Sequence, residues 1–137
     1  MSAQLDQMSQ PPSPRKTKAV VRIKRAYEPV GEDDGVRILV DRLWPRGLTK
    51  EKARIDLWLK DVAPSETLRR RFHGHPDKWR DFVAGYRREL AHEPAKTAAE
   101  GLRERLRRGE PVTLVYAARD EEHNNAVALK SWLERRR

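Results

Sequence analysis

Short apolar stretches of two different periods alternate along this chain. Within residues 19–26, Val21 and Ile23 fall on one face and Arg22, Lys24 and Ala26 on the other, a period of two that predicts a half-buried strand. Residues 36–40 and 112–117 are mostly apolar runs that predict two further strands, the second of them covered on both faces. Residues 55–59 also alternate, and this short stretch predicts either a strand or a helix.

Apolar residues spaced three or four apart predict helices in the second half of the chain. Ser65 is the expected N-cap of the first helix, Gly109 the expected terminator of the third, and Thr49 a possible cap of a separate helical turn. The predicted helices cover about 65–72, 76–90, 95–108 and 124 or 125 to 134.

The order of these elements predicts the fold class. A buried strand between helices implies parallel pairing through right-handed crossovers. We therefore expect an α/β protein, a single layered domain with a small, at least partly parallel sheet flanked by helices. Ligands in such sheets bind beyond the carboxyl ends of the strands. Those ends lead here into residues 41–48, DRLWPRGL, and residues 118–125, ARDEEHNN.

Length and composition set the domain organisation. The 137 residues suffice for one core, which we place at 19–134, between a Pro-, Ser- and Gln-rich tail at 1–18, expected to be flexible, and a basic end at 135–137. The net charge is +9, but more than half of the excess lies on the two ends. A basic balance of this kind favours salt-screened attraction to polyanions rather than a folded nucleic-acid surface.

The absence of cysteine excludes disulfides, thiolate metal sites and cysteine nucleophiles. The longest apolar run is far shorter than the roughly 20 residues that cross a bilayer, and the first ten residues lack the pattern of an export signal. We expect a cytoplasmic protein that needs no membrane. No glycine-rich phosphate fingerprint is present, so the sequence predicts no cofactor.

The loop at 41–48 carries unusual chemistry for a connector. Arg42 and Arg46 flank Trp44 and Pro45 and could direct two guanidinium groups at one oxyanion. Trp44 could stack on a ring. Alternatively, Trp44 fills the core while the arginines pair with Asp41 and the acidic residues 32–34.

The loop at 118–125 offers complementary groups. Asn124 could cap the last helix, whose free N–H groups would receive an anion together with Arg119. Asp120 and His123 could transfer protons, or they could simply be solvated. His73 and His75 lie in an expected helix connection, and we predict no metal site there.

Several segments resemble a known family. From about Val21 to Leu133 the chain is similar to the YeaO-like branch of the DUF488 family of bacterial proteins. The matching segments are IKRAYEP at 23–29, GVRILVDRLWPRGL at 35–48, WLKDVAPS at 58–65, FHGHPDKWRDF at 72–82, YRREL at 86–90 and PVTLVYAARDEEHNNAVAL at 111–129. The resemblance implies a compact cytoplasmic α/β domain and brings no established activity with it.

The resemblance gives weight to Lys24, Asp41, His73 and Tyr116, besides the loop residues above. Together these observations predict two classes of residue. Asp41, His73 and His123 would move protons, and the ligand would be bound by Lys24, Arg42, Trp44, Arg46, Tyr116, Arg119 and Asn124.

Three functional hypotheses follow. The first is a pocket at the carboxyl ends of the strands that binds a small anion, such as a nucleotide or phosphorylated metabolite, with hydrolysis or group transfer as a possible reaction. The second is a nucleic-acid-associated or regulatory protein that uses the basic tails and surface. The third is an interaction module whose tryptophans serve the core or a partner. The first is favoured because the sequence carries no known nucleic-acid-binding signature.

Overall fold

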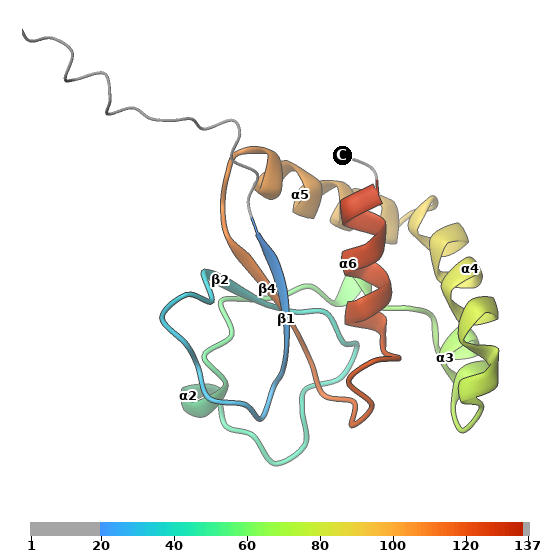
Figure 1. Cartoon of the computed structure of the whole chain (residues 1–137), viewed down its shortest axis with the longest axis horizontal. Helices are drawn as coiled ribbons and strands as arrows, with labels where there is room; N and C mark the ends of the chain where they lie inside the picture. The colour runs from blue at the N-terminus through green and yellow to red at the C-terminus, as the bar shows by residue number, and fades with distance from the viewer. Residues whose placement is uncertain (1–19, 136–137) are drawn as a thin grey trace, which may run out of the picture.

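A four-stranded, fully parallel sheet forms the centre of the molecule (Figure 1). The structure, a computed structural model, describes residues 20–135. The strands lie in the order β1-β4-β2-β3. Their bounds are β1 Val21–Arg25, β2 Val36–Leu39, β3 Leu57–Trp58 and β4 Val112–Tyr116. The fold class is thus the predicted α/β layered domain, and the undecided stretch at 55–59 contains a short strand.

The helices follow the predicted apolar stripes. They are α2 Lys50–Ala53, α3 Glu66–Phe72, α4 Trp79–Leu90, α5 Ala95–Arg107 and α6 Asn125–Arg135, with 3-10 turns η1 at Lys60–Val62 and η2 at Pro76–Lys78. Ser65 caps α3 by accepting a hydrogen bond from Leu68 N–H, and Thr49 caps α2 in the same way through Lys52 N–H. Both capping predictions are confirmed. The helix expected from residue 76 opens with η2, so the α-helix itself begins at Trp79.

The two faces of the sheet have different coverings. Alternate side chains of the strands point to opposite faces. On one face Ile38, Leu114 and Tyr116 pack with apolar side chains of α4, α5 and α6 in the main core. On the other face Leu39 and Val115 pack beneath Trp44, Trp58 and neighbouring loop residues in a smaller core. Trp44 therefore takes the core position that the sequence allowed as an alternative.

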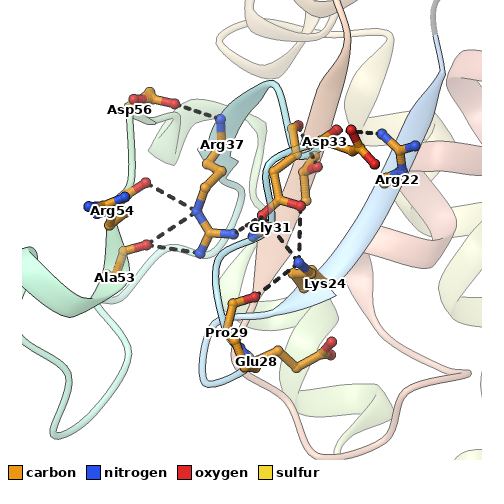
Figure 2. A network of polar contacts seen from close by, with 12 residues as sticks. Arg22, Lys24, Glu28, Pro29, Gly31, Asp33, Arg37, Ala53, Arg54 and Asp56 are labelled. Atoms are coloured by element: carbon orange, nitrogen blue, oxygen red, sulfur yellow. Dashed lines mark hydrogen bonds and ion pairs between the residues drawn. The ribbon is translucent and has the colours of Figure 1, made fainter.

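A buried ionic network occupies the rest of the second face (Figure 2). Arg37, in the middle of β2, is 3% exposed and reaches Asp34 at 2.7 Å and the carbonyl of Ala53 at 2.9 Å. Lys24 of β1 donates to the other oxygen of Asp34 at 3.0 Å. Thr113 of β4 donates to the Asp34 carbonyl at 2.7 Å. The network joins the three adjacent strands β1, β4 and β2.

Hydrogen bonding sets the charge state of this network. Burial works to raise the pKa of Asp34, but the hydrogen bonds from Gly31 N–H, Lys24 and Arg37 outweigh it and lower the pKa below its usual value. Asp34 is therefore a carboxylate that offsets the buried Arg37 charge. An arginine can interrupt this apolar run because its guanidinium has partners inside the fold.

The tail predicted at residues 1–18 and the last two residues of the predicted basic end lie outside the described residues. Arg135 is the last residue of α6. Across residues 20–135, no helix combines the length and apolar character needed to span a membrane.

Candidate functional site at the carboxyl edge of the sheet

The loops after β2 and β4 meet at Asp41. One carboxylate oxygen of Asp41 accepts the Ala117 N–H at 2.9 Å, and the other accepts the Asn125 side-chain amide at 3.1 Å. The same Asn125 amide donates to the Val40 carbonyl at 2.9 Å. The chain after β2 continues toward α2, whereas the chain after β4 continues into α6 on the opposite face. Asp41 thus lies where neighbouring connections diverge, the place where α/β sheets bind ligands.

Burial dominates the electrostatics of Asp41. Burial raises the pKa of Asp41 above its usual value, although hydrogen bonds from Asn125 and from the Ala117 amide, and the charge of Arg69, act in the opposite direction. A raised pKa suits proton transfer. Both oxygens of this carboxylate nevertheless already accept hydrogen bonds from the protein itself.

The first loop directs its predicted ligand residues in different directions. Arg42 donates to the Pro64 carbonyl at 3.0 Å, just before α3. Trp44 donates its indole N–H to the Leu48 carbonyl and packs edge-on against Trp58. The backbone carbonyl of Arg46 accepts the Tyr27 hydroxyl at 2.8 Å. The guanidinium of Arg46 is exposed and has no hydrogen bond or ion pair within residues 20–135.

The second loop is organised around Asn124 and Asp120. Asn124 accepts Val127 N–H at 3.0 Å and donates to the Asp120 carbonyl, which confirms that it caps α6. The Asp120 carboxylate pairs with His123 Nδ1 at 3.1 Å. The His123 ring packs edge-on against Trp79 of α4, with ring centroids 5.1 Å apart.

The remaining predicted residues lie at different distances from this junction. Tyr116 is buried beside it, and burial raises the pKa of its phenol. Arg119 is exposed on the loop. His73 is the exposed C-cap of α3, and no hydrogen bond or ring contact of its side chain links it to the other predicted residues in the described part of the chain. Lys24 belongs to the ionic network.

The structure therefore brings together Asp41, Tyr116 and Asn124 at one junction, with His123 on the α4 side. Asn125, which the sequence interpretation did not include, completes that junction. The role of Asn125 could not be inferred from the local pattern, because its side-chain amide donates to Val40 and Asp41, which lie 85 and 84 positions away in the sequence. No group of three or more possible metal ligands occurs among residues 20–135.

A groove of about 720 Å³ extends from Arg42 along α3 and α4, which lie side by side in Figure 1. We call it the α3–α4 groove. Its apolar lining includes Leu68, Phe72 and Phe82, and Gly85 of α4 also lines it. Its charged lining consists of Arg42, Arg71, Lys78 and Arg88 with Asp61, Asp81, Glu89 and Glu93, besides His92.

Two of the groove's carboxylates already have partners. Glu89 accepts the backbone N–H and the hydroxyl of Ser65, at 2.8 and 2.5 Å. Glu93 accepts the backbone N–H and the hydroxyl of Thr97. The guanidinium groups of Arg71 and Arg88, by contrast, have no hydrogen bond or ion pair anywhere in the part of the chain that the structure describes.

The sheet order and the Asp41 junction define a small parallel α/β domain with a polar carboxyl edge. Residues 20–137 match the family model described as "Inactive DUF488-N3 subclade". The chain belongs to the DUF488 family, as the sequence motifs predicted.

Its relatives place it among the YeaO-like members. The chain is 42% identical over 115 residues to "Uncharacterized protein YeaO" of Escherichia coli, an alignment that covers 82% of this chain and 96% of that protein. It is 41% identical over 116 residues to "Uncharacterized protein Rv3073c" of Mycobacterium tuberculosis, covering 85% and 95%. No solved structure gives a significant match.

Proposed function

We propose that this protein binds a small acidic molecule in the α3–α4 groove and does not convert it. The observation that carries the proposal is the set of guanidinium groups of Arg42, Arg71 and Arg88, which line one groove from three separate elements. A guanidinium presents N–H donors in a fork that matches a carboxylate or phosphate. Arg42 uses one donor on a neutral carbonyl, so its charge remains available.

The size and floor of the groove suit a small ligand. Its volume of about 720 Å³ lies within the range of roughly 300–1,000 Å³ usual for small-molecule sites. Leu68, Phe72 and Phe82 supply apolar surface for the body of the ligand, and the arginines belong to the charged part of the lining. Such a mixture binds organic acids better than a bare inorganic ion, because apolar burial adds to the charged hydrogen bonds.

Two observations favour binding without catalysis. Both oxygens of Asp41, the partly buried carboxylate with the raised pKa, are engaged by Ala117 and Asn125. The matching family model is described by the word "Inactive". We therefore expect the carboxyl edge to act as a structural junction beside the binding groove.

A thermal-shift screen with organic acids and phosphorylated metabolites tests the proposal. A ligand at a hundred times its Kd adds about 2.7 kcal/mol to stability. We expect a hit whose shift is lost in Arg88→Gln and in Arg71→Gln. Arg80→Gln is the matched control, because Arg80 is exposed on α4 and does not line the groove. The hit should be recovered unchanged after incubation with the protein.

Two results would overturn the proposal. The first is a screen in which no acid stabilises the protein, or in which Arg88→Gln behaves like Arg80→Gln. The second is binding only to nucleic acid, with an affinity that falls steeply with salt and is indifferent to the groove variants. That result would favour the alternative of a nucleic-acid-associated or regulatory protein.

A further inference from the structure

Strand β1 forms one edge of the parallel sheet, because it pairs with β4 on one side only. Just beyond its end, Ala26 N–H donates to the Tyr116 carbonyl at 2.7 Å, which directs the even-numbered residues of β1 toward β4. The backbone groups of alternate residues in a strand point to opposite sides in the plane of the sheet. The N–H and carbonyl groups of Val21, Ile23 and Arg25 therefore point away from β4.

The turn after β1 closes one end of this edge. Arg25 N–H donates to the Glu28 carboxylate at 3.0 Å, and the Arg25 carbonyl accepts the Glu28 N–H at 3.1 Å. The backbone groups of Val21 and Ile23, by contrast, have no hydrogen bond within residues 20–135. Their side chains pack in or against the main core, which holds this part of β1 in place. Two donors and two acceptors are thus preformed for an added strand.

The charge of β1 disfavours a second copy of this chain as that added strand. An antiparallel pair that used all the free groups would place Val21 of each copy opposite Ile23 of the other. The two Arg22 side chains would then lie directly opposite each other, and like charges in that position destabilise a sheet. Arg22 is exposed, donates to the Asp33 carbonyl at 2.5 Å and has no ion pair within residues 20–135. A carboxylate opposite Arg22 would instead be stabilising.

We propose that the β1 edge binds an extended segment of another protein as an antiparallel strand, with an acidic residue opposite Arg22 and apolar residues opposite Val21 and Ile23. Side chains of directly opposite residues share one face of the sheet, so the apolar residues extend the face that carries the main core. Lys24 adds less to the preference for acidic residues, because Asp34 already pairs with it. The net charge of +9 strengthens the attraction to an acidic segment.

Amide hydrogen exchange of the full chain, followed by NMR, tests whether the edge is free. The amides of Val21 and Ile23 should exchange at least about tenfold faster than those of Arg22 and Lys24, which face β4. The probe is a short capped peptide of alternating glutamate and valine. At about ten times its Kd, the peptide should slow exchange at Val21 and Ile23 about tenfold, because about nine-tenths of the protein is bound.

Altered peptides and one charge reversal test the contacts. The same peptide with lysine in place of glutamate should bind about fivefold more weakly, because its ammonium groups face Arg22. N-methylation of the valines should weaken binding at least about tenfold, since it removes the donors to the Val21 and Ile23 carbonyls. Arg22→Glu should reverse the preference between glutamate and lysine, a result that a folding defect cannot produce. Arg80→Glu, which alters an exposed residue of α4, is the matched control and should leave the preference unchanged.

Three kinds of result would overturn the proposal. Slow exchange at Val21 and Ile23 in the free full chain would mean that the edge is already occupied, and loss of that protection on dilution would identify a second copy as the occupant. Equal binding of the glutamate and lysine peptides would exclude an acidic segment. Failure of the glutamate peptide to bind, or equal binding of its N-methylated form, would exclude pairing of strands.

Discussion

Asp41, which follows β2, and Asn125, which begins α6, are 84 residues apart in the sequence and are joined by a hydrogen bond of 3.1 Å. The Asn125 amide also reaches the Val40 carbonyl, and Asp41 also binds the Ala117 amide. The two side chains therefore close the carboxyl edge of the sheet between its two central strands.

Asn125→Ala should destabilise the protein by about 1–3 kcal/mol, because it leaves one oxygen of Asp41 and the Val40 carbonyl without this donor. The free energy of unfolding in urea at pH 7 measures the effect. Glu121→Gln, an exposed change in the neighbouring loop, is the control and should lie within about 0.5 kcal/mol of the native protein. Equal stability of Asn125→Ala and this control would show that the junction is not held by the amide.

Asp41 should make the protein less stable as pH rises. Burial raises the pKa of Asp41 in the folded state. Its contribution to the free energy of unfolding is therefore complete below the ordinary pKa of 3.8 and is lost as pH increases through the folded pKa. Asp41→Asn removes this titration. The stability of the native protein minus that of the variant should therefore fall between pH 3 and pH 6, as measured by urea unfolding. A difference that rises over this interval would contradict the raised pKa.

Asp34 should show the opposite dependence. Its pKa is lowered overall, although burial alone would raise it, because Gly31 N–H, Lys24 and Arg37 hydrogen-bond its carboxylate. Its stabilising share is present above 3.8 and is lost as pH falls through the folded pKa. The difference in unfolding free energy between the native protein and Asp34→Asn should thus shrink between pH 5 and pH 2.

At pH 7, Asp34→Asn should cost about 3–5 kcal/mol, because the buried Arg37 charge loses its counter-ion. Asp33→Asn changes an adjacent, exposed carboxylate and should have little effect on the unfolding free energy. A loss for Asp34→Asn no larger than that of Asp33→Asn would mean that Arg37 does not depend on this pair.

Two glycines should respond to alanine in opposite ways. Gly35 has φ +66°, and a Cβ there would lie 2.3 Å from the Pro111 carbonyl oxygen, so Gly35→Ala should cost more than about 2 kcal/mol. Gly101 lies within α5 with nothing within 4 Å of its added Cβ, so Gly101→Ala should stabilise the protein by about 0.5–1 kcal/mol. Thermal unfolding of both variants measures the effects. A stable Gly35→Ala protein would exclude the close approach between the β1–β2 loop and Pro111.

The sequence predicted most of the helices and strands, because helix caps and apolar stripes involve residues that lie close together along the chain. Ser65 caps α3 through a residue three positions away, and the apolar stripe of α4 repeats over neighbouring turns. The position of Trp44 stayed open because a tryptophan beside two arginines suits both a ligand site and a core. Its packing against Trp58 depends on where β3 lies in the sheet.

The candidate site was predicted less completely. The two loops after β2 and β4 were identified from the order of strands and helices, a rule of topology that needs no side-chain detail. The groove was not, since it is lined by residues of α3 and α4 whose mutual approach depends on Gly85 and Leu68. In the sequence, Arg88 is one of many basic residues, and only the structure shows that it lines the groove.

By itself, the sequence determined the class of the fold, the family and the positions of the helices and strands. Apolar residues recur at the period of each helix or strand, and each helix cap contacts residues only a few positions away. Tertiary structure alone decided which charges are satisfied inside the protein and which face the groove. The pairing of Asp34 with Arg37 and of Asp41 with Asn125 depends on side-chain directions and on contacts across the sheet. So does the position of Arg88, whose guanidinium lines the groove without an ion pair within residues 20–135. A hydrogen bond depends on distances of a few tenths of an ångström, and no periodicity along a chain encodes those distances.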